Sequence, residues 1–219
     1  IGSLDLIAFF APAGTEGVVL DSLSKRGNWA RKKLSAKRRA EEIIQHLLNI
    51  YVKRRGLSRP AFSQDMSLEG PFLESFPFED TPDQISAWNN ISEDLSANSP
   101  MDRLLCGDVG FGKTELAMRA AFRVAFNGGQ VVVLAPTSIL VNQHLAVFKD
   151  RFKGFGFNIG CLYGALTLKE KDEVCCLWVE KKLDILIAST AVLYNDVFMR
   201  ASSLFIVDEE HRFGVRAKE

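Results

Sequence analysis

The sequence predicts an α/β fold in which helices cover a parallel sheet, and three observations lead to this prediction. Short apolar segments recur between residues 101 and 209, and several are apolar throughout, as in strands buried on both faces. Helical stretches alternate with them, which favours parallel strands joined by right-handed crossovers. A glycine-rich stretch, CGDVGFGKTE at residues 106–115, lies between a predicted strand and a predicted helix.

Each element of this alternation can be assigned to a short stretch of sequence. The predicted strands are MDRLLC, QVVVLAPT, FNIGCLYG, LDILIAST and SLFIVDEE. The predicted helices are KTELAMRAAFRVAF, which a helix-stopping Asn-Gly-Gly follows, SILVNQHLAVFKDRF and TLKEKDEVCCLWVEKK. The first strand, expected at Arg103–Cys106, leads directly into the glycine-rich stretch.

The chain ahead of this region divides into two parts. Residues 1–24 begin with a short apolar stretch that Ala-Pro-Ala-Gly interrupts, and we expect them to be the remnant of an upstream β-module. From Trp29 to Arg55 there is no Gly or Pro, and apolar residues recur every three or four positions, which predicts one long amphipathic helix. We therefore expect residues 25–70 to form this helix and a loop-rich connector, and residues 71–219 to form the α/β lobe.

The net charge of zero conceals a basic segment. Between Lys25 and Arg59 there are 12 Lys and Arg residues against two acids, Glu41 and Glu42. The favoured interpretation is a solvated helix that joins two modules, and the alternative is a helix that contacts nucleic acid. No apolar run approaches the roughly 20 residues that span a bilayer, so we expect no membrane association.

The cysteines indicate a reducing compartment. They show no CxxC spacing, and two of them are neighbours that would point to different sides of a helix. We expect all four to be reduced core thiols in a cytoplasmic protein rather than metal ligands or disulfides. They are Cys106, Cys161, Cys175 and Cys176.

The glycine-rich stretch fits the pattern GxxxxGK[ST] of a phosphate-binding P-loop. Successive backbone N–H groups of such a loop surround phosphate, and the helix that follows adds the positive end of its dipole. Lys113 is expected to reach the β- and γ-phosphates, and the Thr114 hydroxyl to ligate Mg²⁺. The residues expected to contact the nucleotide here are Gly107, Asp108, Val109, Gly110, Phe111, Gly112, Lys113 and Thr114.

A second motif, LFIVDEEH, ends the last predicted strand. Asp208 at the strand's carboxyl end is expected to hold Mg²⁺ directly or through water, and Glu209 to polarise the attacking water. A run of acids at a strand end can also be a plain solvated loop. The P-loop about 95 residues upstream, with strands between, favours the catalytic interpretation.

A third motif, SFPFEDTPDQ, precedes the P-loop and ends in Gln84. A glutamine amide can accept from the N6 amino group of adenine and donate to N7, which would select ATP. Phe78 offers a ring on which the base could stack. Phe and Gln near a proline turn are common, so this assignment depends on the two phosphate motifs.

The order and spacing of the three motifs resemble those of superfamily 2 DNA translocases and helicases. The residues within and around these motifs most resemble those of the bacterial transcription-repair coupling factors. The stretches that carry this resemblance are FPFEDTPDQ, PMDRLLCGDVGFGKTELAMRAAF, VVVLAPTSILVNQH and LFIVDEEHRFGVRAKE. Phe111 favours that family over the RecG-like fork-remodelling helicases. The front of the chain resembles the family's segment between its RNA-polymerase-interacting module and its motor. This resemblance lies in SLDLI, in residues Gly27–Trp29 and in the predicted helix that ends in NIYVKRRG.

This resemblance implies a function. It implies a RecA-like lobe that binds ATP and Mg²⁺ in a translocase that moves on double-stranded DNA and displaces stalled RNA polymerase during transcription-coupled repair. The implied catalytic residues are Lys113, Glu209 and His211, the last linking hydrolysis to DNA binding. The implied partners are duplex DNA, RNA polymerase through a module upstream of residue 1, and nucleotide excision repair proteins.

The resemblance also implies a second RecA-like lobe after Glu219, which would supply an arginine finger. We therefore expect residues 1–219 to be an incomplete motor that is nearly inactive alone. Two other interpretations stay open: a RecG-like helicase of branched DNA, and a non-catalytic relic that only binds nucleotide or partners.

Some stretches depart from the family pattern. IASTAVL stands where the family has Gly-Thr-His, and CLYGALT looks more RecG-like. Ser and Thr hydroxyls still bind phosphate oxygens, so DNA contacts are expected at Thr137, Ser189 and Thr190. We expect packing or helix-surface roles for His46, His144, Trp88 and Trp178.

Overall fold

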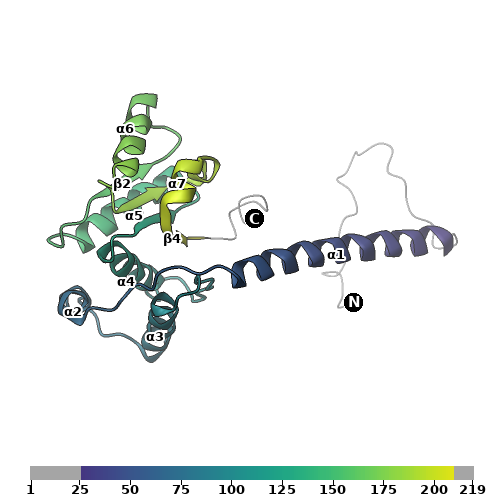
Figure 1. Cartoon of the computed structure of the whole chain (residues 1–219), viewed down its shortest axis with the longest axis horizontal. Coiled ribbons are helices and arrows are strands. Elements are labelled where there is room, and N and C mark those ends of the chain that lie inside the picture. The colour runs from purple at the N-terminus through teal and green to yellow at the C-terminus, as the bar shows by residue number, and fades with distance from the viewer. Residues whose placement is uncertain (1–25, 210–219) are drawn as a thin grey trace, which may run out of the picture. The chain divides into compact units, whose positions relative to one another are not determined.

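The computed structural model describes residues 26–209 and divides the chain into two units, residues 1–56 and 57–219 (Figure 1). In the first unit, α1 is a 30-residue helix at Arg26–Arg55, which confirms the predicted long helix and begins it three residues earlier. Six of its large apolar side chains are about half exposed or more, from Leu48 at 49% to Val52 at 66%. The predicted β-module remnant at 1–24 lies outside the described residues.

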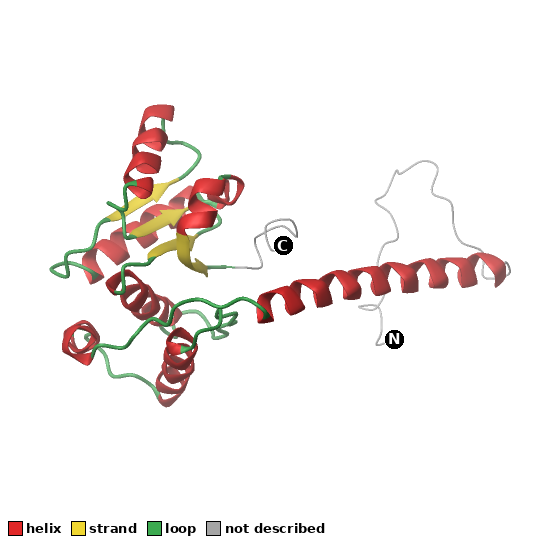
Figure 2. Cartoon of the chain, viewed as in Figure 1, coloured by secondary structure: helices red, strands yellow, loops and turns green. Residues whose placement is uncertain are grey.

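The second unit is built on a four-stranded parallel sheet (Figure 2). The strands are β1 (Gln130–Leu134), β2 (Ile159–Leu162), β3 (Ile185–Ala188) and β4 (Ser202–Val207). Their spatial order is β2-β3-β1-β4, and every neighbouring pair is parallel. The predicted α/β fold with a parallel sheet is therefore confirmed, and four of the five predicted strands form.

The fifth predicted strand is wrong. Residues 101–108 have no regular structure and pair with no strand of the described sheet. Met101 and Leu105 pack against the core, but Leu104 is 75% exposed. Met101 and Leu105 are only partly buried and the other side chains of residues 101–108 are exposed, so the segment lacks the two apolar faces that an inner strand of a parallel sheet requires.

The predicted helices all form, and polar side chains cap the starts of two of them. They are α4 (Lys113–Phe126), α5 (Ser138–Arg151) and α6 (Leu168–Val179). Thr137 caps α5, and Thr167 with Glu170 forms a capping box on α6. The structure adds α3 (Pro82–Ser96), α7 (Asp196–Ala201) and the short 3₁₀ helix η2 (Thr190–Tyr194).

The connector holds a helix that its sequence does not suggest. We expected a loop-rich connector up to residue 70, but α2 spans Met66–Glu74 with Pro71 inside it. Asp65 caps the helix by accepting from the Ser67 N–H, and Phe72 is buried against α4 and its neighbours. Tertiary packing of this face outweighs the cost of the internal proline.

The sheet is buried on both faces, and its side chains alternate between two hydrophobic clusters. Val131 and Val133 of β1 lie in a cluster with residues of α2, α3, α4 and α5, which is rich in phenylalanine. Val132 and Leu134 lie in the other, with α6 and α7. Trp88 and Trp178 are buried in these clusters, which confirms their predicted packing roles.

The cysteine prediction is partly wrong. All four cysteines are free thiols, as expected, but none is fully buried. Cys106 and Cys176 are exposed, because the strand expected before the P-loop does not form and because α6 turns one of its two adjacent cysteines to solvent. Burial raises the pKa of the Cys161 thiol.

Candidate nucleotide site

The phosphate-binding loop occupies residues 107–112 and leads into α4, which begins at Lys113 as predicted. Gly110 and Gly112 have positive φ angles of 87° and 74°, a region that residues with a Cβ rarely adopt. A Cβ added to Gly112 would also lie 2.4 Å from the Gln84 Nε2. The last glycine of the motif is thus required by its conformation, and a side chain there would also displace the Gln84 amide.

Lys113 lies folded back over this loop. Its Nζ donates to the carbonyl oxygens of Gly107 at 2.6 Å and Asp108 at 2.7 Å. The loop itself is exposed, and Val109 is almost fully so. An ammonium held only by exposed carbonyl oxygens can exchange them for phosphate oxygens, which are stronger acceptors for a cation.

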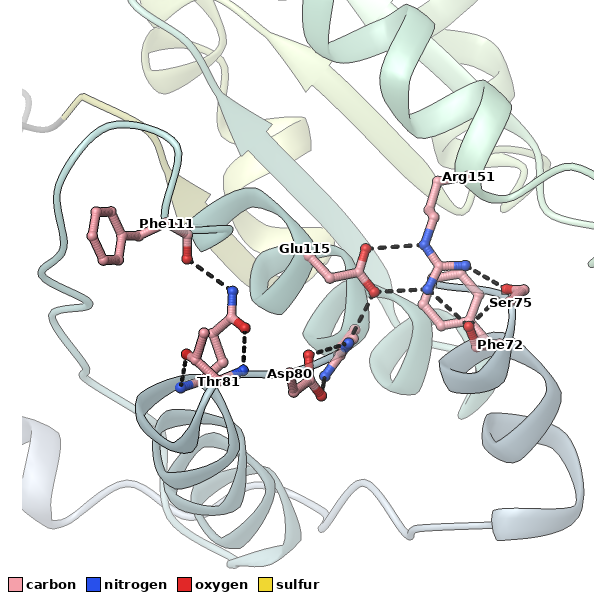
Figure 3. Close-up of polar contacts among 9 residues, drawn as sticks. Phe72, Ser75, Asp80, Thr81, Phe111, Glu115 and Arg151 are labelled. Carbon is pink, nitrogen blue, oxygen red and sulfur yellow. Dashed lines mark hydrogen bonds and ion pairs between the residues drawn. The ribbon is translucent and has the colours of Figure 1, made fainter. Parts of the chain in front are cut away.

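Gln84 joins the segment before the P-loop to the P-loop itself (Figure 3). Its Oε1 accepts from the Thr81 N–H at 2.8 Å as part of a capping box on α3, and its Nε2 donates to the Phe111 carbonyl at 3.0 Å. A primary amide has two N–H donors and two acceptor lone pairs. One donor and one acceptor therefore remain, which is the set that adenine N7 and N6 require.

Phe78 lies six residues before Gln84 in the sequence. Its side chain is 73% exposed, and its neighbour Phe76 meets it edge-on with 5.5 Å between ring centroids. One partner holds the ring and leaves the rest of its surface to solvent. This exposure is what stacking on a nucleobase would need.

Asp208 follows β4 at the carboxyl edge of the sheet. Its backbone N–H donates to the Leu134 carbonyl at 3.0 Å, which places it beside the end of β1. The Nε2 of His144 lies 2.7 Å from the Asp208 Oδ2. This hydrogen bond is the main influence that lowers the pKa of Asp208, and the positive charge of Lys113 adds a smaller share.

The prediction of a plain packing or surface role for His144 is wrong. The histidine lies on α5, and its side chain is 13% exposed. Its partner is 64 residues away, so no local pattern indicates the contact. The signal available in the sequence was topological, because α5 follows β1, and β1 is the neighbour of β4 in the sheet.

The site offers oxygen ligands for Mg²⁺ rather than a complete protein cage. In the part of the chain that the structure describes, no group of three or more His, Cys, Asp or Glu residues could hold a metal ion. The Thr114 hydroxyl and the Asp208 carboxylate are hard oxygen donors of the kind that Mg²⁺ shares with substrate phosphates. The donor set therefore fits Mg²⁺ bound together with a nucleotide.

The structure describes all of the remaining predicted site residues except His211. Glu209 is exposed beside Asp208 with a positive φ of 53°, and His211 lies outside the described residues. Thr137 follows β1 and Ser189 follows β3, so both lie at the same carboxyl edge as Asp208. Thr190 begins η2 directly after Ser189.

Two curated proteins and one solved structure are similar to this chain. It is 40% identical over all 219 residues to a transcription-repair-coupling factor from Borreliella burgdorferi and 42% identical over 219 residues to that of Escherichia coli. The chain spans about 19% of the length of each of these curated relatives. A solved structure of RecG bound to a three-way DNA junction superposes with a TM-score of 0.70 at 33% identity, covering 76% of this chain and 23% of that one.

A parallel sheet whose carboxyl edge gathers a P-loop lysine, an Asp-Glu pair and the end of β1 defines a P-loop lobe of the helicase type. The model of the DEAD/DEAH box helicase domain matches residues 81–219. The chain belongs to the DEAD/DEAH box helicase family. None of the described helices is long and apolar enough to cross a membrane.

Proposed function

We propose that this chain is the ATP-binding lobe of a superfamily 2 translocase that moves on double-stranded DNA and displaces stalled RNA polymerase in transcription-coupled repair. The observation that supports it most is the convergence at one sheet edge. Lys113 acts electrostatically on Asp208, and Gln84 bonds the P-loop backbone, although the three come from distant parts of the chain. The identity to coupling factors over the whole chain supports the biological role.

Each residue of the site has a defined task in this proposal. Lys113 leaves its carbonyl partners and binds the β- and γ-phosphates, while the loop N–H groups surround them. Bound Mg²⁺ would neutralise charge on the phosphates, with Thr114 and Asp208 as its protein ligands. Glu209 orients the attacking water.

The proposal includes the partners of the complete protein. Duplex DNA would contact the backbone and hydroxyls of Thr137, Ser189 and Thr190, and His211 would link that contact to hydrolysis. RNA polymerase would bind a module upstream of residue 1, and nucleotide excision repair proteins would follow in the same cytoplasmic process. A second lobe would supply the arginine finger, so residues 1–219 alone would hydrolyse ATP very slowly.

A RecG-like helicase of branched DNA is the second candidate. The structural match to RecG favours it, although its 33% identity is below the 40–42% of the coupling factors over a larger part of the chain. Fluorescence anisotropy with a duplex and a three-way junction separates the two. We expect equal affinity for both, and a junction preference of about tenfold or more would favour the RecG-like candidate.

Mg-ATP binding measured by calorimetry tests the nucleotide site. We expect Lys113→Ala to weaken binding by more than about 100-fold, because it removes the cation that faces the phosphates. Lys171→Ala is the matched control, since the Nζ of Lys171 also donates to a loop carbonyl, that of Gly164 at 2.8 Å, away from the P-loop. Equal ATP affinity for the wild type and Lys113→Ala would contradict the site.

A further inference from the structure

The segment that carries the base-recognition residues is fixed to α4 by a forked ion pair. This base-recognition segment is residues 76–84 and includes Phe78 and Gln84. Arg119 donates from Nη1 to the Asp80 Oδ2 at 2.7 Å and from Nη2 to the Oδ1 at 3.0 Å. The arginine is 4% exposed, so the pair is screened little by solvent on that side.

Arg119 also pairs with a second carboxylate, in the first turn of α4 directly after the P-loop, and this contact extends the ion pair into a network (Figure 3). Arg119 Nε donates to Glu115 Oε1 at 3.0 Å, and Glu115 is buried only two residues after Lys113. Arg151 from α5 completes the group, donating to both Glu115 oxygens at 2.9 and 2.7 Å. Two arginines and two carboxylates thus form a charge-balanced network across three elements.

Arginine side chains also contact the residues at the start of the base-recognition segment and just before it. Arg151 donates to the Phe72 carbonyl at 2.8 Å, and its guanidinium lies 4.0 Å from the centre of the Phe72 ring. The Arg119 guanidinium lies 5.2 Å from the centre of the Phe76 ring, which in turn contacts Phe78. Downstream, Gln84 bonds the Phe111 carbonyl. Asp80 is therefore the charged anchor between the two groups expected to meet adenine.

We propose that Asp80 and Arg119 are positioning residues for base recognition. Their ion pair holds Phe78 and Gln84 beside the P-loop, so that a base meets a placed ring and amide when its phosphates bind. Asp80 directly precedes Thr81, whose backbone N–H fixes the Gln84 amide oxygen. Without the pair the segment loses this link to α4. Binding of the base then has to order the segment, and the entropy cost of that ordering lowers the affinity for the base. This inference rests on the proposed function.

Comparison of two ligands tests this role. Calorimetry with Mg-ATP and with Mg-tripolyphosphate, which lacks the base, is performed on the wild type and on Asp80→Asn. We expect the ATP affinity to fall about tenfold and the tripolyphosphate affinity to change less than about twofold. Asp94→Asn is the control, because it removes an Asp–Arg pair, with Arg103, that does not touch the segment. We expect this control to leave both affinities unchanged.

A double variant tests whether Asp80 affects ATP binding through Gln84. If Asp80 acts through Gln84, Asp80→Asn should lower ATP affinity much less in a Gln84→Ala background than in the wild type. Fully additive losses in both a Gln84→Ala and a Phe78→Ala background would overturn the role. Asp80→Glu keeps the charge but lengthens the side chain, and it should reduce ATP relative to tripolyphosphate affinity even if Asp80→Asn fails to fold.

The outcomes separate this inference from the function on which it rests. If the wild type binds neither ligand, the proposed nucleotide site fails. If the wild type binds both, but Asp80→Asn and Asp80→Glu weaken both ligands equally or neither, the site stands and the positioning role is overturned.

Discussion

At the scale of single residues, the contact between His144 and Asp208 adds most to what the motifs say. The P-loop and Asp-Glu motifs could be assigned from the sequence because their function requires fixed local spacing. His144 could not, because its contact with Asp208 depends on how β1 and β4 pair. Side-chain hydrogen bonds behind a metal ligand are decided by the fold rather than by neighbouring residues.

We expect His144→Ala to raise the Mg²⁺ concentration needed for half-maximal ATP binding by about tenfold, as is typical when a residue that orients a ligand is lost. The hydrogen bond that orients the Asp208 carboxylate disappears in this variant. A magnesium titration at fixed ATP, followed by calorimetry, measures the change. His144→Asn keeps a donor and should recover part of the loss.

Gln143→Ala is the matched control for this titration, because Gln143 is the exposed neighbour of His144 on the same helix. It should leave the magnesium requirement unchanged. An unchanged requirement in His144→Ala would show that Asp208 needs no partner on α5.

At the scale of elements, sequence patterns succeeded where an element is stabilised by its own residues. The helices α4, α5 and α6 combine apolar periodicity with local stop or cap signals, and each forms within a few residues of its predicted bounds. Sequence patterns failed where packing against distant residues determines the secondary structure. A loop-rich connector was expected where α2 begins, and MDRLLC looked like a strand although only one of its sides reaches the core.

α2 is attached to the lobe by a buried ion pair that no local pattern indicates. Arg123 of α4 is fully buried and donates to both oxygens of Glu69, at 2.7 and 2.8 Å, across 54 residues of sequence. It also donates to the Ser92 hydroxyl of α3 at 2.7 Å. One arginine therefore joins three helices on the same face of the sheet.

We expect Glu69→Ala to lower the free energy of unfolding by about 3–5 kcal/mol, because it leaves the Arg123 charge buried without its partner. Urea denaturation measures this change. Asp196→Ala, which breaks an exposed pair with Arg200, is the control and should cost no more than about 0.5 kcal/mol. Similar losses in the two variants would argue against a structural role for the buried pair.

At the scale of the whole molecule, the proposed function requires a second lobe beside the one that the structure describes. The sequence predicted the parallel sheet and the residues at its carboxyl edge, since strand–helix alternation dictates both. It could not predict that Arg119 pairs with Asp80 and that Arg151 pairs with Glu115, because these partners lie 39 and 36 residues apart. Those links determine how the base-recognition segment meets the P-loop.

The central claim is that this lobe binds ATP but needs a partner lobe to hydrolyse it at a useful rate. In the proposed function, an arginine finger from a second lobe would contribute roughly 10³–10⁵ in rate, as in related phosphoryl-transfer systems, and DNA would stimulate hydrolysis by favouring closure of the two lobes around the nucleotide. Steady-state ATP hydrolysis by residues 1–219, with and without duplex DNA, measures this directly. We predict turnover near background that DNA does not change, and recovery when the second lobe is supplied. DNA-stimulated turnover of about one per second or faster from residues 1–219 alone would contradict the claim.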